Sequence, residues 1–283
     1  MSKALNNPPR AALYVPADNP RALKKARGLE ADLMILDLED AVAPAAKAGA
    51  RTAACAAVAA LAPKPVLIRI NALTSPWGPD DLTAVLAARP QGVLLPKVNT
   101  AGDIAAARAQ AGGLPLWAMI ETPRAVLNLA AIAASGVAGL VLGSNDLLKE
   151  MGARPMPDAA NLHAAMSLCV IAARAHGLTV LDGVHNDIAD SEGFAAAARL
   201  ARDFGFDGKT VIHPAQIPLC NAAFTPGAEE IAAARAILDA FAAQPDAGVI
   251  ALNGRMVERL HADSAARLLA RAQAGPNPES AGP

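Results

Sequence analysis

The fold is indicated by one stretch, LMILDLEDAVAPAAKAGARTAACAAVAALAPKPVLIRI, which covers residues 33–70. It begins with an apolar run, Leu33–Leu38, and ends with a second one, Val66–Ile70, and the alanine-rich segment Ala45–Leu61 lies between them. The two runs are nearly continuous in apolar character, which is typical of parallel strands covered on both faces. The stretch therefore predicts a strand, a helix and a second strand parallel to the first.

The same alternation continues along most of the chain and predicts eight strands with helices between them. The predicted strands are Ala12–Val15, Leu33–Leu38, Val66–Ile70, Gly92–Lys97, Leu116–Ile120, Gly139–Leu142, Thr179–Leu181 and Thr210–Ile212. Later helices are predicted at Arg124–Ala134 and Ala159–His176, and a loop at Lys149–Asp158. Eight such units match an α/β fold, the (β/α)8 TIM barrel. A doubly wound sheet is the main alternative, but no GxGxxG motif opens the first helix.

The chain continues beyond the eighth predicted strand. We expect a barrel catalytic domain at residues 1–224 and a C-terminal helical extension at residues 225–283. The extension reads as a helix Ala228–Ala243, a short extended piece Val249–Leu252 and a last helix near Ala262–Ala274. A barrel needs no such segment, so we expect it to pack on a neighbouring subunit or to cap its own barrel.

Composition excludes several classes of protein. The 283 residues include 25 Lys and Arg against 26 Asp and Glu, and this balance argues against a partner that is a nucleic acid or an acidic membrane surface. The longest apolar run, Ala53–Ala62, is far shorter than the roughly 18–20 residues that span a bilayer. The start, MSKALNNPPR, lacks the apolar core of an export signal. We therefore expect a cytoplasmic enzyme that binds neither nucleic acid nor membrane.

Ionisable residues gather where the predicted strands end. Seven of the eight strands end in or beside such a group, while the strands themselves are apolar. The groups are Asp37, Glu39, Asp40, Arg69, Lys97, Glu121, Asp146, Asp182 and His213. Because catalytic groups of barrel enzymes stand at the carboxyl ends of strands, this pattern predicts a polar active site at one mouth of the barrel.

Three of these residues suggest a particular chemistry. Glu121 and Asp146 are hard oxygen ligands on adjacent strand ends, and Mg²⁺ is typically held by one or two carboxylates. Arg69 offers a planar fork that suits a carboxylate. Together they predict a small oxo acid bound to Mg²⁺, with its carboxylate held by Arg69.

Other interpretations stay open for the basic residues. Arg69 could form an internal salt bridge with Asp37 or Glu39, and Lys47 or Lys97 could balance the Glu39 and Asp40 carboxylates. Lys97 could also act as a Schiff-base lysine, although an ion pair in the core is the simpler role. The chain has no HxxxH zinc motif and no GxSxG nucleophile motif.

Two longer motifs make the chain recognisable. LYVPADNPRALKKA (residues 13–26) and ADLMILDLEDAVAP (residues 31–44) closely resemble the opening of the citrate lyase β-subunit-like family, within the HpcH/HpaI aldolase superfamily. The likeness continues in order through IRIN (68–71), LLPK (94–97), IETP (120–123), GSNDL (143–147), DGVHND (182–187) and GKTVIHPAQI (208–217). It covers nearly the whole chain.

The resemblance implies a Mg²⁺-dependent carbon–carbon lyase, usually a homotrimer. Such enzymes cleave 3-hydroxyacyl-CoA thioesters such as malyl-, citramalyl- or citryl-CoA to acetyl-CoA and an oxo acid, or they catalyse the reverse condensation. Two alternatives within the family are an acyl-CoA thioesterase and a non-catalytic or complex-dependent β-type subunit. The last would work with a citrate lyase α subunit and an acyl carrier protein.

The resemblance also implies roles for individual residues. Arg69 would bind the substrate carboxylate and assist catalysis. Glu121 and Asp146 would hold Mg²⁺, and Glu121 would also belong to the substrate-binding site. Arg21 and Lys24 would lie near the CoA phosphates, or simply on a solvated helix face. Glu258, in GRMVERL (254–260), stands where many relatives carry a catalytic Asp that a neighbouring subunit delivers. Its extra methylene leaves two roles open, a catalytic carboxylate or a surface charge.

Overall fold

The chain forms two compact units, Met1–Phe224 and Thr225–Pro283. The computed structural model describes residues 7–274. The outer ends of the two predicted domains, residues 1–6 and 275–283, lie outside the described residues and include most of the start MSKALNNPPR. That the second unit packs on a neighbouring subunit stays a prediction.

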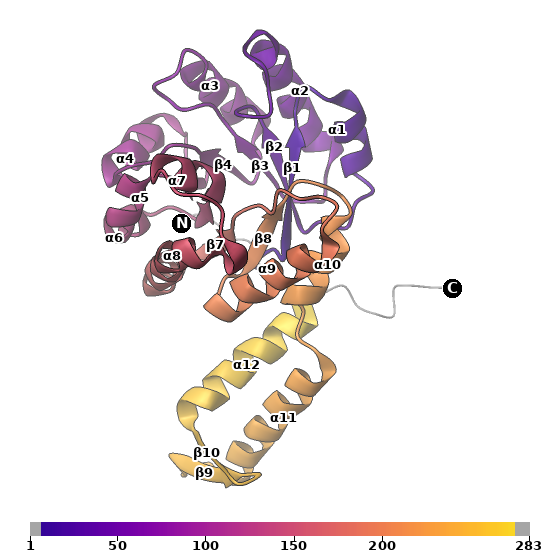
Figure 1. The fold of residues 1–283 in the computed structure, drawn as a ribbon, viewed down its shortest axis with the longest axis vertical. Helices are drawn as coiled ribbons and strands as arrows, with labels where there is room; N and C mark the ends of the chain where they lie inside the picture. The colour runs from indigo at the N-terminus through magenta and orange to yellow at the C-terminus, as the bar shows by residue number, and fades with distance from the viewer. Residues whose placement is uncertain (1–6, 275–283) are drawn as a thin grey trace. The chain divides into compact units, whose positions relative to one another are not determined.

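The first unit is a closed barrel of eight parallel strands surrounded by helices (Figure 1). The strands are β1 (Ala11–Pro16), β2 (Leu33–Asp37), β3 (Val66–Arg69), β4 (Gly92–Leu95), β5 (Leu116–Ile120), β6 (Gly139–Leu142), β7 (Thr179–Asp182) and β8 (Gly208–Val211). Each pairs with the next, and β8 pairs with β1 to close the barrel. The predicted α/β barrel is confirmed, and the limits of its strands differ from the predicted ones by two residues or fewer.

Helices connect the strands. They are α1 (Pro20–Ala26), α2 (Lys47–Ala60), α3 (Gly78–Ala88), α4 (Ala101–Gln110), α5 (Pro123–Leu127), α6 (Leu129–Ala134), α7 (Ser144–Glu150), α8 (His163–His176), α9 (Ser191–Phe204) and α10 (Gln216–Phe224), with 3-10 helices η1 (Pro44–Ala46) and η2 (Pro157–Leu162). Among the described residues, no helix combines the length and the apolar character needed to cross a membrane.

Three predicted segments are wrong in detail. The α-helix expected at Ala159–His176 begins only at His163, after the 3-10 helix η2. The helix expected at Arg124–Ala134 is broken at Asn128, whose side-chain amide donates to the carbonyl of Asn99, 3.0 Å away, and whose φ and ψ are −104° and 10°. The loop expected at Lys149–Asp158 begins later, because α7 extends to Glu150. The first turn of α7 also carries a predicted site residue, Asp146, which therefore projects from a helix and not from a strand end.

Side chains alternate between the inside of the barrel and the layer under the helices. The inside is a small apolar cluster of Ala12, Leu33, Ile35, Leu67, Leu94, Trp117, Met119, Val141 and Leu181. Since inward positions recur every second residue, the next inward positions after Ile35, Leu67 and Met119 are Asp37, Arg69 and Glu121. The apolar filling thus ends in a polar layer at the carboxyl ends of the strands.

The second unit is a pair of helices with a hairpin. It contains α11 (Ala228–Ala243), β9 (Val249–Leu252), β10 (Arg255–Glu258) and α12 (Arg259–Ala274), and the two strands pair antiparallel (Figure 1). The sequence did not predict β10. Asn253 and Gly254 both have positive φ, 52° and 76°, which is the backbone of a tight two-residue hairpin turn. Phe241, Ile250 and Val257 form the core of this unit.

Candidate active site

A cavity of about 370 Å³ opens at the carboxyl ends of the barrel strands. It is lined by Tyr14, Pro16, Asp37, Asp40, Ala41, Arg69, Met119, Glu121, Leu142, Gly143, Ser144, Asn145, Asp146, Val184, Asn186, Thr210 and Ile212. The structure therefore brings three of the predicted site residues, Arg69, Glu121 and Asp146, to one cavity. Their functional roles stay predictions.

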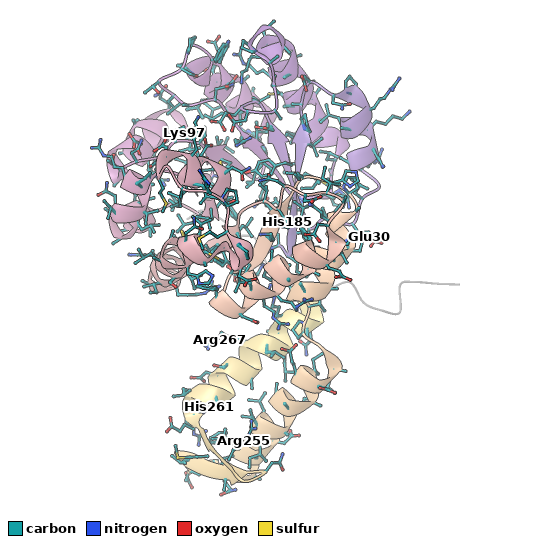
Figure 2. The ribbon with its side chains drawn as sticks, in the orientation of Figure 1. Glu30, Lys97, His185, Arg255, His261 and Arg267 are labelled. Carbon is teal, nitrogen blue, oxygen red and sulfur yellow. The ribbon has the colours of Figure 1, made fainter. Side chains whose placement is uncertain are left out.

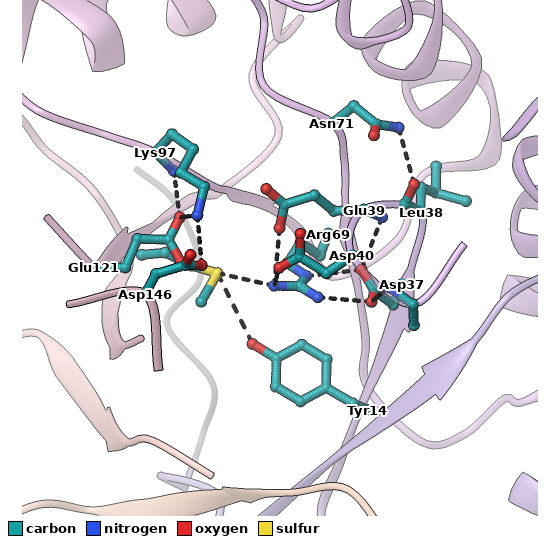
Figure 3. Close-up of polar contacts among 12 residues, drawn as sticks. Tyr14, Asp37, Leu38, Glu39, Asp40, Arg69, Asn71, Lys97, Glu121 and Asp146 are labelled. Atoms are coloured by element: carbon teal, nitrogen blue, oxygen red, sulfur yellow. Dashed lines mark hydrogen bonds and ion pairs between the residues drawn. The ribbon is translucent and has the colours of Figure 1, made fainter. Parts of the chain in front are cut away.

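Arg69 is held in a buried set of ion pairs, which we call the Arg69 cluster (Arg69, Asp37 and Glu39). Asp37 and Arg69 are register partners on β2 and β3, so their side chains point the same way. Arg69 donates from Nε to Asp37 Oδ1 and from Nη2 to Asp37 Oδ2, each over 2.7 Å (Figure 3). Its third nitrogen, Nη1, lies 2.9 Å from Glu39 Oε2 and 3.5 Å from Asp40 Oδ2. The internal salt bridge left open by the sequence is thus present.

The backbone of the segment that carries Glu39 is held by hydrogen bonds from two other side chains. Lys47 donates from Nζ to the carbonyl oxygens of Leu38 (2.9 Å) and Glu39 (2.8 Å), and Asn71 donates to the Leu38 carbonyl at 2.9 Å. Lys47 therefore binds backbone carbonyls, and among the described contacts it forms no ion pair with the Glu39 or Asp40 carboxylate. Because the backbone is held on two sides, the Glu39 carboxylate is presented to Arg69 by a rigid support.

Burial shapes the protonation of the Arg69 cluster. Desolvation raises the pKa of Glu39 from 4.5 to about 8, although the charge of Arg69 opposes that rise. Desolvation lowers the pKa of Arg69, but the charge and hydrogen bonds of Asp37 more than offset it, so the net pKa lies above the ordinary value. The ring of Tyr14 lies under the guanidinium, 4.9 Å from its carbon. Arg69 is therefore a permanent cation, while Glu39 changes charge near neutral pH.

The second group, which we call the Lys97 cluster (Lys97, Glu121 and Asp146), lies across the cavity from the first (Figure 3). Lys97 donates from Nζ to Asp146 Oδ2 over 2.5 Å, and Nζ lies 3.5 Å from Glu121 Oε1. The Lys97 backbone N–H also donates to Glu121 Oε1, over 2.6 Å. The ion-pair interpretation of Lys97 agrees with these contacts.

Glu121 is fully buried, and only one of its two carboxylate oxygens has a hydrogen-bond partner. Its Oε2 has no hydrogen-bond partner, and desolvation raises the pKa of its carboxyl group, against the opposing effect of Lys97. Gly143 allows the close approach of β6 to this side chain, since a Cβ there would lie 2.4 Å from Glu121 Cβ. Burial of a carboxylate oxygen without a partner is costly, and such an oxygen is free to accept a further donor or a cation.

These donors fit a magnesium ion. The described residues contain no group of three or more His, Cys, Asp or Glu placed to hold a metal. The candidate protein ligands are therefore two carboxylates, Glu121 and Asp146. Mg²⁺ is commonly held by one or two carboxylates and takes its other ligands from water and substrate oxygens. The ammonium of Lys97 already lies between the two carboxylates, so this position accepts positive charge.

The remaining predicted residues lie on other elements. Arg21 and Lys24 are exposed on α1 and do not line it. Glu258 ends β10 in the second unit, where its backbone N–H donates to Nδ1 of His261, which is labelled in Figure 2. The CoA-binding role of Arg21 and Lys24 and the catalytic role of Glu258 stay predictions.

Two further cavity residues were not singled out from the sequence. Asn145 and Asn186 exchange side-chain hydrogen bonds of 3.0 and 2.8 Å and so join the segment after β6 to the segment after β7. They belong to the GSNDL and DGVHND motifs, but a single sequence does not reveal that these motifs meet. Tyr14 also lines the cavity and was not singled out. It lies within β1 and not at its end, so a search of strand ends does not find it.

A closed parallel barrel with ionisable side chains at the carboxyl ends of its strands defines the class of (β/α)8-barrel enzymes. Residues 10–214 match the model of the HpcH/HpaI aldolase/citrate lyase family, and the chain belongs to this family as a citrate lyase β-like member.

Named relatives cover almost all of the chain. It is 45% identical over 273 residues to a (3S)-malyl-CoA thioesterase of Cereibacter sphaeroides, with 95% of this chain and 96% of that protein covered. It is 32% identical to the citrate lyase β subunit of Escherichia coli K12, with 93% of each covered. Among solved structures, CitE of Mycobacterium tuberculosis in complex with magnesium, acetoacetate and coenzyme A matches with a TM-score of 0.83 at 35% identity, covering 96% of this chain and 100% of that one.

Proposed function

We propose that this protein is a Mg²⁺-dependent thioesterase that hydrolyses a 3-hydroxyacyl-CoA of the malyl type to free CoA and a hydroxy acid. The observation that carries the proposal is the identity of 45% to a (3S)-malyl-CoA thioesterase along 95% of the chain, against 32% to a citrate lyase β subunit. The family resemblance alone implies carbon–carbon cleavage, with hydrolysis as an alternative. The two identities favour hydrolysis over carbon–carbon cleavage.

The charge of the cavity supports a divalent cation. Four carboxylates and one cation line it, and a fifth carboxylate and a second cation pair with these residues. The lining acids are Asp37, Asp40, Glu121 and Asp146, and the lining cation is Arg69. Glu39 pairs with Arg69, and Lys97 pairs with Glu121 and Asp146. An anionic acyl group would be repelled by this excess of negative charge unless further positive charge is added or a carboxyl is protonated. Glu121 and Asp146 would hold Mg²⁺, which when bound would polarise a substrate oxygen as a Lewis acid.

Arg69 would orient the acyl group. Its Nε and Nη2 are committed to Asp37, so Nη1 is the nitrogen available to a substrate carboxylate. Glu39 now lies against Nη1, and its pKa of about 8 means that it can be neutral near pH 7. A substrate carboxylate that approaches Nη1 would therefore meet a carboxylic acid at Glu39 and not a second full negative charge.

Hydrolysis also needs an acceptor for a proton of the attacking water. The water oxygen forms a bond to the thioester carbon, the carbon–sulfur bond breaks, and CoA leaves as a thiolate that needs no acid. Asp40 lines the cavity, and its side chain is 62% exposed, so it is the cavity carboxylate most open to water. We assign it to hold the water and accept its proton.

The test is a product balance with (3S)-malyl-CoA and Mg²⁺. We expect free CoA and malate to form in equal amounts, with no acetyl-CoA or glyoxylate. The variant Asp40→Asn should lose hydrolysis while it retains the bound metal. Formation of acetyl-CoA and glyoxylate in place of free CoA would overturn the thioesterase proposal.

Carbon–carbon cleavage is the second candidate. The identity to a citrate lyase β subunit along 93% of both chains favours it, and it gives Glu258 a role as the group that moves a proton at the acetyl carbon. Under this proposal Glu258→Gln lowers glyoxylate formation and spares the binding of oxo acids. Copurification of an α subunit and an acyl carrier protein would favour the complex-dependent form.

A further inference from the structure

Lys97 occupies the position that the proposed function gives to the metal. Its ammonium nitrogen lies 2.5 Å from Asp146 Oδ2 and 3.5 Å from Glu121 Oε1, between the two proposed ligands. The side chain of Lys97 is one-third exposed, whereas that of Glu121 is fully buried. The cation at this position can therefore move to solvent, while the carboxylate below it cannot.

The backbone holds Lys97 in this position at a cost. Lys97 has φ of 53°, in the left-handed region that non-glycine residues rarely adopt. Its N–H in this conformation donates to Glu121 Oε1 at 2.6 Å. Strained backbone of this kind persists where surrounding contacts overdetermine it, and it is common at functional sites. The strained residue thus contacts one proposed ligand through its backbone and both through its side chain.

The ammonium also leaves the site incompletely satisfied. Glu121 Oε2 is buried and has no hydrogen-bond partner. Its other oxygen, Oε1, accepts from the Lys97 backbone N–H and lies near the Lys97 ammonium. A lysine is a point charge on a flexible stem, and it cannot reach all the lone pairs that a divalent ion would engage. The lysine therefore balances charge without filling the site.

We propose that Lys97 is a built-in competitor for the metal, which stabilises Glu121 and Asp146 while no metal is bound and must withdraw its ammonium when one binds. The inference rests on the metal assignment in the proposed function. It predicts that Lys97 weakens metal affinity and stabilises the metal-free protein, two effects of opposite sign from one side chain.

The test is titration of Mn²⁺, a paramagnetic substitute for Mg²⁺, into the substrate-free full chain with electron paramagnetic resonance as readout. The variant Lys97→Met removes the charge and, being a non-glycine residue, leaves the backbone strain unchanged. We expect it to bind Mn²⁺ about tenfold more tightly than the wild type. Without metal it should unfold at a lower temperature than the wild type, and saturating Mn²⁺ should remove that difference.

Controls separate contact from general charge. Lys149→Met removes an exposed positive charge from the same helix as Asp146 and should leave Mn²⁺ affinity unchanged. The gain from Lys97→Met should persist near 1 M salt, where the Debye length falls to about 3 Å. Should methionine impair folding, Lys97→Gln repeats the test with a neutral polar side chain.

Each outcome decides between the two assignments. Wild-type protein that binds Mn²⁺, with Lys97→Met no tighter or with Lys149→Met equally improved, overturns the role of Lys97 and leaves the metal site standing. Failure of both wild type and Lys97→Met to bind Mn²⁺ overturns the metal assignment itself. Binding that is lost in Glu121→Gln and enhanced in Lys97→Met supports both.

Discussion

The two ionic clusters of the cavity use the same chemistry in different ways. In the Arg69 cluster, two parallel hydrogen bonds of 2.7 Å join a guanidinium to a carboxylate that is 2% exposed. In the Lys97 cluster, one ammonium on a flexible stem lies between Glu121 and Asp146, and one Glu121 oxygen has no partner. The first cation is held by two bonds from a planar fork, and under our proposal the second is exchangeable.

The difference follows from the shape of the two cations. A guanidinium matches a carboxylate with two bonds and keeps its charge at every accessible pH, whereas an ammonium is a point charge that another cation can replace. We therefore assign orientation of the acyl group to the Arg69 cluster and metal binding to the Lys97 cluster. The variants below test this division, from the largest expected effect to the smallest.

Removing the locked cation should have the largest effect. Arg69→Met leaves Asp37 buried without its partner, and breaking a buried pair in this way costs about 3–5 kcal/mol of unfolding free energy. Hydrolysis should also be lost. Urea unfolding and release of free CoA measure the two effects. Arg69→Lys is the matched variant, and it should recover part of the stability but little activity, because it lacks the fork. Full recovery by lysine would contradict the assigned role of the fork.

Neutralising Glu121, a proposed metal ligand of the Lys97 cluster, should affect activity far more than stability. Glu121→Gln keeps the size of the side chain and removes a buried charge whose own pKa is raised by desolvation. We expect Mg²⁺-dependent turnover to fall by on the order of 10²-fold or more. The free energy of unfolding should stay within about 1 kcal/mol of the wild type. A variant that is strongly destabilised but still active would mean that Glu121 is structural.

A steric change can disturb one cluster alone. Gly143→Ala places a Cβ 2.4 Å from Glu121 Cβ and 2.7 Å from its Oε2, while neither Asp37 nor Arg69 is among the atoms it meets. Overpacking of this kind costs about 1–3 kcal/mol. We expect weaker Mn²⁺ binding, measured by electron paramagnetic resonance. Unchanged metal affinity at reduced stability would show that Glu121 adapts to the extra methyl group without loss of its ligand geometry.

The smallest effect concerns the protonation of the Arg69 cluster. Because the pKa of Glu39 is about 8 when folded and near 4.5 when unfolded, between these values the folded protein holds a proton that the unfolded chain has released. The stability that this proton provides is complete below about pH 4.5 and decreases as the pH rises to about 8. Glu39→Gln removes this dependence, so its stability advantage over the wild type should grow from pH 5 to pH 8 in urea unfolding. An advantage independent of pH would contradict the raised pKa.

Much of the fold could be predicted from the sequence. Most of the barrel strands are apolar runs that lie between two covered faces, and this makes them recognisable without tertiary information. The exception is β8, GKTV, whose Lys209 pairs with Asp182 of β7. Short helices were harder to predict. The α7 helix has seven residues and a polar sequence, SNDLLKE, and the break between α5 and α6 depends on a hydrogen bond from Asn128 to a residue 29 positions away.

The candidate site was only partly predictable. The positions of Arg69, Glu121 and Asp146 beside strand ends suggested a common mouth, since the ends of parallel strands meet there. The sequence offered several possible partners for Arg69 and Lys97, but it could not decide among them. Lys97 contacts Asp146 across 49 residues of sequence, and the competing partners of Arg69 are all acidic and equally plausible from composition.

The sequence by itself determined the barrel and the acidic and basic residues at its mouth, because apolar periodicity and strand ends are local properties of the chain. The tertiary structure decided which charges pair. Strand register sets Asp37 beside Arg69, and a left-handed backbone at Lys97 sets its ammonium between Glu121 and Asp146. Pairing depends on distances of a few ångströms between distant segments, and only the closed barrel sets those distances.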